Sequence, residues 1–356
     1  MNKSKVYHQG LVELLEQLID LEISQILLFG VPKRRNPNGG LSSSKRGIIQ
    51  NSIRKIKGNF GNNFTIFSDV CLCQYNTSGH CGIMPSKTSN IGIKRRNSYD
   101  LMIDNDKTLQ SLGRISLSLC ESGTDFIAPS AMMDGQVLYL RRLLDNHGFK
   151  YVKILSYSAK HNSCLYSPFR NSNYLNTNFI DKSSYQCSFN NKSESIREIL
   201  LDVREGADWV MIKPSFWYMD IIRHVRELVN VPLVVQNVSG EYALLRSLVD
   251  SVSLKGLSIP TDISPTNSPN RIRRTSGFSK EGGGFRSVQS RLKQSLTDIG
   301  HYDNWRNPSD LGDNNTVYDF DAIGKFILSL KRAGADKIIT YFLLDLIKDK
   351  DDKKIQ

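Results

Sequence analysis

Seven short apolar runs, each six or seven residues long, alternate with longer amphipathic segments along the chain. The runs are rich in β-branched and aromatic residues and carry few charges, which is typical of strands buried on both faces. They lie at 25–30, 64–70, 125–130, 153–159, 209–215, 233–239 and 337–342. Helical periodicity occurs between them, near 106–121, 134–147, 193–205, 218–229 and 320–333. The alternation predicts a parallel sheet covered by helices, either doubly wound or a (β/α)₈ barrel.

Two segments fall outside this pattern. Residues 259–317 are rich in Ser, Pro, Asn and Gly and are predicted to be a low-complexity, disordered insertion. Residues 345–356 form a charged tail. The rest of the 356 residues suits one TIM-barrel domain, although a closed barrel of this kind has eight strands and only seven runs are found.

The charge of the chain is concentrated in two places. The net charge is +12, and residues 31–60 hold eight basic residues and no acid, while 271–293 hold seven basic residues and one acid. Neither patch has interleaved aromatic residues or a known nucleic-acid-binding motif. We therefore expect solvated surface and no nucleic-acid partner, with binding to nucleic acid or to an anionic surface as the alternative.

The chain has no run of about 18 apolar residues, so no membrane partner is expected. The first 20 residues contain acids and no apolar signal region, which argues against secretion. Six cysteines without a signal indicate reduced thiols in an intracellular protein. The sequence does not distinguish the cytoplasm from a plastid.

Two lysines stand at the ends of apolar runs. Lys160 follows the run at 153–159, and Lys213 lies between Ile212 and Pro214. Burial and a second nearby cation both lower the pKa of a lysine, which makes the neutral amine available as a nucleophile. Two such amines suit Schiff-base chemistry on two carbonyl compounds; ion pairing or exposure at the rim is the alternative for each.

A cysteine-rich loop follows the run at 64–70. It contains Cys71, Cys73 and Cys81, with Asp69 just before it and His80 within it. Three thiolates with an open fourth position are typical of a catalytic zinc site. Three unliganded buried cysteines are the alternative.

Polar groups that suit a carboxylate lie nearby in the sequence. Arg170 and Lys182 fall in a polar segment after Lys160, which is typical of a lid that carries cations. Ser239 and Tyr341 stand at the ends of two further runs. Ordinary surface residues are the alternative reading for the two cations.

Except for Lys182, these residues occur in strings that resemble the porphobilinogen synthase (delta-aminolevulinic acid dehydratase) family. The strings are LFGVP (28–32), SDVCLCQYNTSGHCGI (68–83), APSAMMDGQV (128–137), SYSAK (156–160), YSPFR (166–170), REGADWVMIKP (204–214), VSGEY (238–242) and AGADKIITYF (333–342). The resemblance implies a (β/α)₈ barrel, a homo-octamer, and condensation of two 5-aminolevulinate molecules to porphobilinogen with loss of two waters in haem synthesis.

The resemblance also implies roles for individual residues. Lys213 and Lys160 match the Schiff-base lysines of the first and second substrate, and Asp69 matches a residue of the metal loop that relays protons. The remaining matches are Ser239 and Tyr341 for the first carboxylate, Arg170 and Lys182 for the second, Cys71, Cys73 and Cys81 for zinc, and Glu198 for a regulatory magnesium.

Compared with the family, the chain is expected to lack the N-terminal arm and the first barrel strand, and the 259–317 segment replaces a short connection. An active zinc enzyme is the leading interpretation. The alternatives are a truncated, catalytically impaired member or incomplete gene model, and a different Schiff-base lyase on a barrel.

Overall fold

The computed structural model describes residues 10–85, 103–168, 180–254 and 317–342. The chain divides into two compact units, the first made of Met1–Arg246 and Ile323–Gln356 and the second of Ser247–Ala322. The predicted insertion at 259–317 lies outside the described residues except for Val317, and the predicted tail at 345–356 lies outside them entirely. Apart from residues 247–254 and 317–322, which are the described part of the second unit, the fold and the site described below belong to the first unit.

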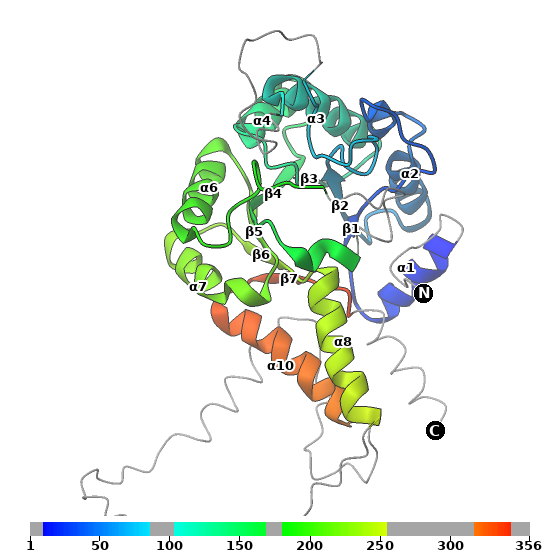
Figure 1. Ribbon diagram of the computed structural model, residues 1–356. Coiled ribbons are helices and arrows are strands. Elements are labelled where there is room, and N and C mark those ends of the chain that lie inside the picture. The colour runs from blue at the N-terminus through cyan, green and yellow to red at the C-terminus, as the bar shows by residue number, and fades with distance from the viewer. Residues whose placement is uncertain (1–9, 86–102, 169–179, 255–316, 343–356) are drawn as a thin grey trace, which may run out of the picture. The chain divides into compact units, whose positions relative to one another are not determined.

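All seven predicted strands are found, and they form one parallel sheet in chain order. The strands are β1 (Gln25–Leu28), β2 (Thr65–Val70), β3 (Phe126–Pro129), β4 (Lys153–Lys160), β5 (Trp209–Lys213), β6 (Leu233–Gln236) and β7 (Lys337–Ile339). The sheet curls around a common centre (Figure 1), with β1 and β7 as its edges within the described residues. The fold is therefore α/β and TIM-barrel-like, with seven strands in the described part of the chain.

Helices alternate with the strands along the chain. They are α1 (Leu11–Asp20), α2 (Ile48–Phe60), α3 (Asn105–Cys120), α4 (Gln136–Asn146), α6 (Lys192–Glu205), α7 (Met219–Leu228), α8 (Ser239–Leu254) and α10 (Val317–Ala333). Of these, α2, α3, α4, α6 and α7 lie around the outside of the sheet (Figure 1). Short 3₁₀ turns occur at η2 (Gly40–Ser43), η3 (Cys164–Tyr166) and η4 (Phe216–Tyr218). No helix among the described residues is both long and apolar enough to cross a membrane.

The capping of these helices follows from local sequence. Asp104 accepts a hydrogen bond from the backbone N–H of Lys107 at the start of α3 (3.1 Å). Asn191 does the same for Glu194 at the start of α6 (3.2 Å), and α6 ends at Gly206 with φ 102°. These side chains satisfy N–H groups that a helix leaves unpaired, and glycine adopts the left-handed conformation without strain.

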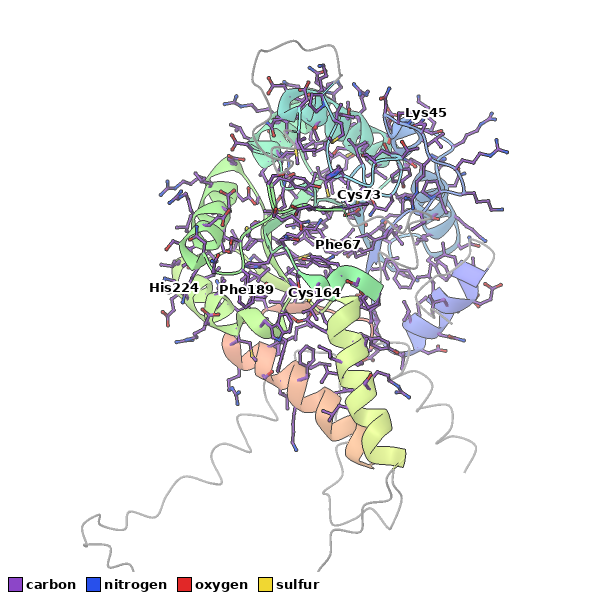
Figure 2. All side chains as sticks on the ribbon, viewed as in Figure 1. Lys45, Phe67, Cys73, Cys164, Phe189 and His224 are labelled. Atoms are coloured by element: carbon purple, nitrogen blue, oxygen red, sulfur yellow. The ribbon has the colours of Figure 1, made fainter. Side chains whose placement is uncertain are left out.

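Side chains that point into the ring form a core of their own. Phe67, Phe126, Tyr157 and Met211 belong to it, and the rings of Phe67 and Phe126 stack with centroids 4.1 Å apart. Figure 2 places Phe67 and Cys73 inside the ring of helices and Lys45 and His224 at the periphery. Alternate residues of the same strands face outward and pack against the helices, as the period of two in a strand requires.

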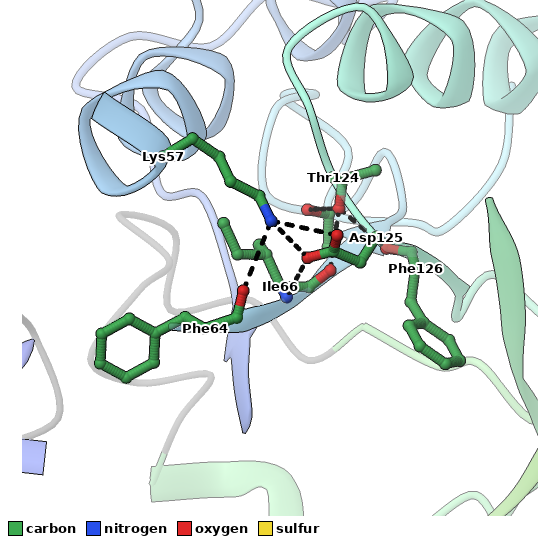
Figure 3. A network of polar contacts seen from close by, with 7 residues as sticks. Lys57, Phe64, Ile66, Thr124, Asp125 and Phe126 are labelled. Carbon is green, nitrogen blue, oxygen red and sulfur yellow. Dashed lines mark hydrogen bonds and ion pairs between the residues drawn. The ribbon is translucent and has the colours of Figure 1, made fainter. Parts of the chain in front are cut away.

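An aspartate directly precedes each of β3, β5 and β7 and accepts a hydrogen bond from the preceding strand. Asp125 accepts from the backbone N–H of Ile66 (2.7 Å) and pairs with the Lys57 ammonium (2.9 Å), as Figure 3 shows. Asp208 accepts from Ile154 N–H (2.8 Å), and Asp336 accepts from Leu233 N–H (2.7 Å). These bonds fix the register of three strand pairs at their N-terminal ends.

Candidate active site

The C-terminal ends of the strands converge on one pocket. Because side chains alternate along a strand, Asp69 and Lys213 point to the same side as Phe67 and Met211, which lie in the inner core. The residues that line the pocket are Phe29, Cys73, Gln74, Ser130, Lys160, Tyr166, Lys182, Gln186, Lys213, Val238, Ser239 and Tyr341. Six of them were singled out from the sequence: Cys73, Lys160, Lys182, Lys213, Ser239 and Tyr341.

An irregularity in β4 brings Lys160 into the pocket. Ser156 pairs with Val210 and Ala159 with Ile212, so β4 contains one residue more than β5 between these pairs. The extra residue is a bulge, and it reverses the alternation of side chains beyond it. Lys160 consequently pairs with Lys213 and faces the ring interior.

The amine of Lys213 lies among aromatic rings. Its Nζ is 5.6 Å from the ring centroid of Phe29, 5.3 Å from that of Tyr157 and 5.6 Å from that of Tyr166. Burial, followed by the positive charge of Lys160, lowers the pKa of Lys213 from 10.5 to about 7. A substantial fraction of neutral amine is therefore present near neutral pH.

The Lys160 amine lies over the ring of Tyr157, which also lies beneath the Lys213 amine. Its Nζ donates a hydrogen bond to the backbone carbonyl of Ser130 (2.6 Å) and lies 5.7 Å from the Tyr157 ring centroid. The Lys160 side chain is buried. Both amines thus contact the face of the Tyr157 ring.

Asp69 supplies a buried carboxylate between these cations and the cysteine loop. Its Oδ2 accepts a hydrogen bond from Gln74 Nε2 (3.1 Å). Burial raises the pKa of Asp69, and the positive charges of Lys160 and Lys213 oppose that rise. A carboxyl group in such surroundings is suited to accepting and returning a proton.

Cys71, Cys73 and Cys81 form a compact buried cluster. Their sulfurs all lie within 4.8 Å of one another, and Cys71 Sγ is 3.3 Å from Cys73 Sγ. A tetrahedral zinc with bonds of about 2.3 Å needs sulfurs roughly 3.8 Å apart, so the spacing fits such an ion.

The electrostatics of this cluster favour one thiolate. Hydrogen bonds from Cys71 and Cys73 hold the pKa of Cys81 well below its usual range. The hydrogen bonds that Cys71 makes with Cys73 and Cys81 raise the pKa of Cys71. Lys182 Nζ lies 3.4 Å from Cys81 Sγ. Lys182, expected as a lid cation, therefore lies against the cysteine cluster as well as lining the pocket. Arg170 lies outside the described residues.

Two hydroxyl groups follow β6 and β7, the strands that come after the two lysine-bearing strands. The cysteine loop follows β2, which comes before those strands. Ser239 begins α8, and its Oγ donates to the Leu165 carbonyl (3.4 Å). Tyr341 follows β7, and burial raises its pKa to about 12, which keeps the phenol protonated. Both groups line the pocket and can donate hydrogen bonds to a carboxylate.

Glu198 does not lie with the other predicted site residues. It belongs to α6, on the outside of the ring, and does not line the pocket. Burial raises its pKa, and so do the charges of Asp134, Glu194 and Glu205. The structure thus surrounds Glu198 with acidic groups but leaves it apart from the lysines.

Sequence reasoning missed several members of the site. Tyr157, within the string SYSAK, lies in β4 with its ring in the inner core, and Ser130, within APSAMMDG, directly follows β3. The period of two, counted forward from Phe126 and Ala128, places Ser130 on the inner side of the sheet and could have assigned it to the site. The carboxylate of Glu241 was missed because two of its partners, Ser215 and Phe216, are remote in sequence.

Comparisons with known proteins agree on one family. A sequence profile described as delta-aminolevulinic acid dehydratase matches residues 2–257. A protein of that name from Archaeoglobus fulgidus is 41% identical over 235 residues, or 66% of this chain and 68% of its own. Another, from Methanothermobacter thermautotrophicus, is 40% identical over 331 residues, or 93% of this chain and 77% of its own.

A solved structure shares the fold. The delta-aminolevulinic acid dehydratase (porphobilinogen synthase) of Toxoplasma gondii, crystallised with the reaction product porphobilinogen, superposes with a TM-score of 0.71. The match covers 98% of this chain and 78% of that one, at 24% sequence identity. This likeness independently supports the barrel architecture.

Proposed function

Because the chain belongs to the delta-aminolevulinic acid dehydratase family, we propose that its strand-end pocket condenses two 5-aminolevulinate molecules to porphobilinogen with loss of two waters. This lyase reaction makes a pyrrole for tetrapyrrole and haem synthesis. The observation that carries the proposal is the pairing of Lys160 with Lys213 in one pocket, since the reaction joins two ketones.

Lys213 is the nucleophile for the first substrate. Its neutral amine attacks the ketone carbon, and loss of the carbonyl oxygen as water leaves a Schiff base. The lowered pKa of about 7 supports this role, because a protonated amine has no lone pair to donate. Asp69 is the proton carrier for these steps, as its buried carboxylate lies in the field of both lysines.

Lys160 holds the second substrate. Its amine donates a hydrogen bond to the Ser130 carbonyl at 2.6 Å and lies beside the same tyrosine ring as Lys213. The neutral form of this amine attacks the second ketone, and the carbonyl oxygen leaves as water to give the second Schiff base. Two ketones bound to neighbouring lysines are held close together, which replaces an encounter in solution by a reaction within one site.

The substrate carboxylates are held by polar groups at the rim. Ser239 and Tyr341 donate hydrogen bonds to the first carboxylate, and both line the pocket beside Lys213. Arg170 and Lys182 hold the second carboxylate, a role that rests for Arg170 on the sequence alone. Lys182 lines the pocket and so is placed for this contact.

Cys71, Cys73 and Cys81 hold a zinc ion in this proposal. The thiolate character of Cys81 and the spacing of the three sulfurs support a soft, tetrahedral metal. When bound, zinc supplies Lewis-acid polarisation of a substrate oxygen. The neighbouring residues Gln74 and Lys182 orient and neutralise the cluster from the pocket side.

Two further features are carried over from the family resemblance. The chain assembles into a homo-octamer, and Glu198 binds a regulatory magnesium. The acidic surroundings of Glu198 support a cation at this position.

The proposal is tested with the whole purified chain. The protein is loaded with zinc and incubated with 5-aminolevulinate, and pyrrole formation is measured with and without a chelator. We expect pyrrole that disappears with the chelator and returns with zinc. A folded, zinc-loaded protein that makes no pyrrole would support the alternative of a catalytically impaired member.

A further inference from the structure

The carboxylate of Glu241 binds two separate loops at once. Its Oε1 accepts hydrogen bonds from Ser215 N–H (2.9 Å), from Ser215 Oγ (3.0 Å) and from Phe216 N–H. Its Oε2 accepts from Val238 N–H (2.7 Å). Glu241 is 3% exposed, so these bonds form away from water, where hydrogen bonds to a charged group are strongest.

The two loops lead directly to two residues of the pocket. Ser215 lies two residues after Lys213, at the end of β5. Val238 immediately precedes Ser239, the first residue of α8. One buried carboxylate therefore links the loop of the amine nucleophile to the loop of the carboxylate-binding hydroxyl.

The start of α8 is held from a third side by the turn that follows Lys160. A Cβ atom placed on Gly240 would lie 2.5 Å from the carbonyl oxygen of Leu165 and 2.6 Å from its Cα, which only glycine permits. Ser239 Oγ also donates to that carbonyl at 3.4 Å. The backbone around Ser239 consequently has little freedom to compensate if the Glu241 bonds are lost.

We propose that Glu241 is a positioning residue that fixes the spacing between the Lys213 amine and the Ser239 hydroxyl, and thereby selects ketones that carry a carboxylate. The inference rests on the proposed function, in which Lys213 attacks the ketone and Ser239 binds the carboxylate. Glu241 itself does not line the pocket, so it acts only through these two residues.

The chemistry of the four bonds predicts what a glutamine does at this position. Every partner offers an N–H or O–H to the side chain, so both oxygens of Glu241 act as acceptors. Glutamine has the same shape but only one acceptor atom, and its NH₂ group faces a donor on one of the loops. Glu241→Gln therefore breaks the link between the loops without opening a cavity.

The test compares two ketones in a borohydride trapping reaction on the full-length protein. One is 4-oxopentanoate, which has a carboxylate, and the other is 2-pentanone, which has none. The proteins are the wild type, Glu241→Gln and the control Glu227→Gln. Glu227 lies on the surface of α7 with a side chain that is 60% exposed.

The wild type is expected to label Lys213 faster with 4-oxopentanoate than with 2-pentanone. In Glu241→Gln this preference falls by about tenfold or more, the size expected for losing a hydrogen bond to a charged group, while labelling by 2-pentanone changes little. Glu227→Gln keeps the wild-type preference. A preference unchanged in Glu241→Gln overturns the inference, because a purely structural role lowers stability without altering this ratio.

Two results separate the inference from the proposed function. Absence of label in the wild type, or absence of a preference for 4-oxopentanoate, overturns the proposed roles of Lys213 and Ser239.

If Glu241→Gln does not fold, hydrogen exchange measured on the wild type replaces the trapping experiment. Binding of 4-oxopentanoate then slows exchange at Ser215, Phe216 and Val238 together, and slowing at Val238 alone contradicts the link.

Discussion

Lys160 and Lys213 are register partners across β4 and β5, and both amines lie over the ring of Tyr157. Their Nζ atoms are 5.7 Å and 5.3 Å from its centroid. The two positive charges repel each other, while the aromatic face and Asp69 attract both. Burial lowers the pKa of Lys213 most, the charge of Lys160 lowers it further, and the charge of Asp69 raises it. The resulting pKa of about 7 leaves Lys213 near its midpoint of protonation at neutral pH, which is the physical basis of the proposed chemistry.

The first prediction concerns the pH dependence of Lys213. Its pKa is lowered to about 7, and only the neutral form attacks a ketone, so the rate of borohydride labelling rises through pH 7 and levels off above it. Lys160→Met removes a positive charge that lowers this pKa, so its labelling midpoint moves to higher pH. Labelling is followed by mass spectrometry, and a wild-type midpoint near 10 contradicts the account.

Asp69 acts on the same lysine with the opposite sign. Its negative charge raises the pKa of Lys213, so Asp69→Asn moves the labelling midpoint below pH 7. Because the amide cannot carry the proton, pyrrole formation falls by about 100-fold or more, the range expected for a general acid–base group. A variant with a lower midpoint but full activity would show that Asp69 tunes Lys213 without moving protons.

The cysteine cluster is tested by metal content. Cys73→Ala removes one of three ligands, and zinc affinity falls by more than about 100-fold, beyond the loss typical of an outer-shell partner. Cys120→Ala is the matched control, because Cys120 is also buried but lies in α3 away from the cluster. Equal zinc content in both variants would exclude the cluster as the metal site.

The aspartates at the N-terminal ends of the strands are predicted to stabilise the fold without affecting the reaction. Asp208→Ala leaves the N–H of Ile154 without its 2.8 Å partner, which lowers the free energy of unfolding by about 1–3 kcal/mol. Glu227→Ala, on an exposed ion pair, changes it by less than about 0.5 kcal/mol. Denaturant unfolding and steady-state rates measured on the same samples check both parts.

Much of the fold was predictable because every strand lies within an apolar run, and the runs of β2 to β6 are almost entirely buried. The same runs identified Lys213, Tyr341 and Ser239, since the chemistry of a barrel gathers where its strands end. The inward orientation of Lys160 was not predictable in detail, because it depends on the extra residue between Ser156 and Ala159 in the pairing with β5.

Two further features depend on contacts between distant parts of the chain. Lys182 lies against Cys81, 101 residues away, so its partner cannot be recognised from local sequence. Glu241 binds Ser215 and Phe216, 26 and 25 residues away, and its capping position at the start of α8 gives no hint of them. Sequence patterns therefore identify reactive residues more readily than they identify the residues that hold those reactive residues in place.

The most direct test of the central claim is to reduce the complex of the zinc-loaded protein and 5-aminolevulinate with borohydride and to map the modified peptide. The account predicts a stable adduct on Lys213, with further label on Lys160 at high substrate concentration and loss of the first adduct in Lys213→Met. An adduct on neither lysine, in a protein that still forms pyrrole, would contradict it.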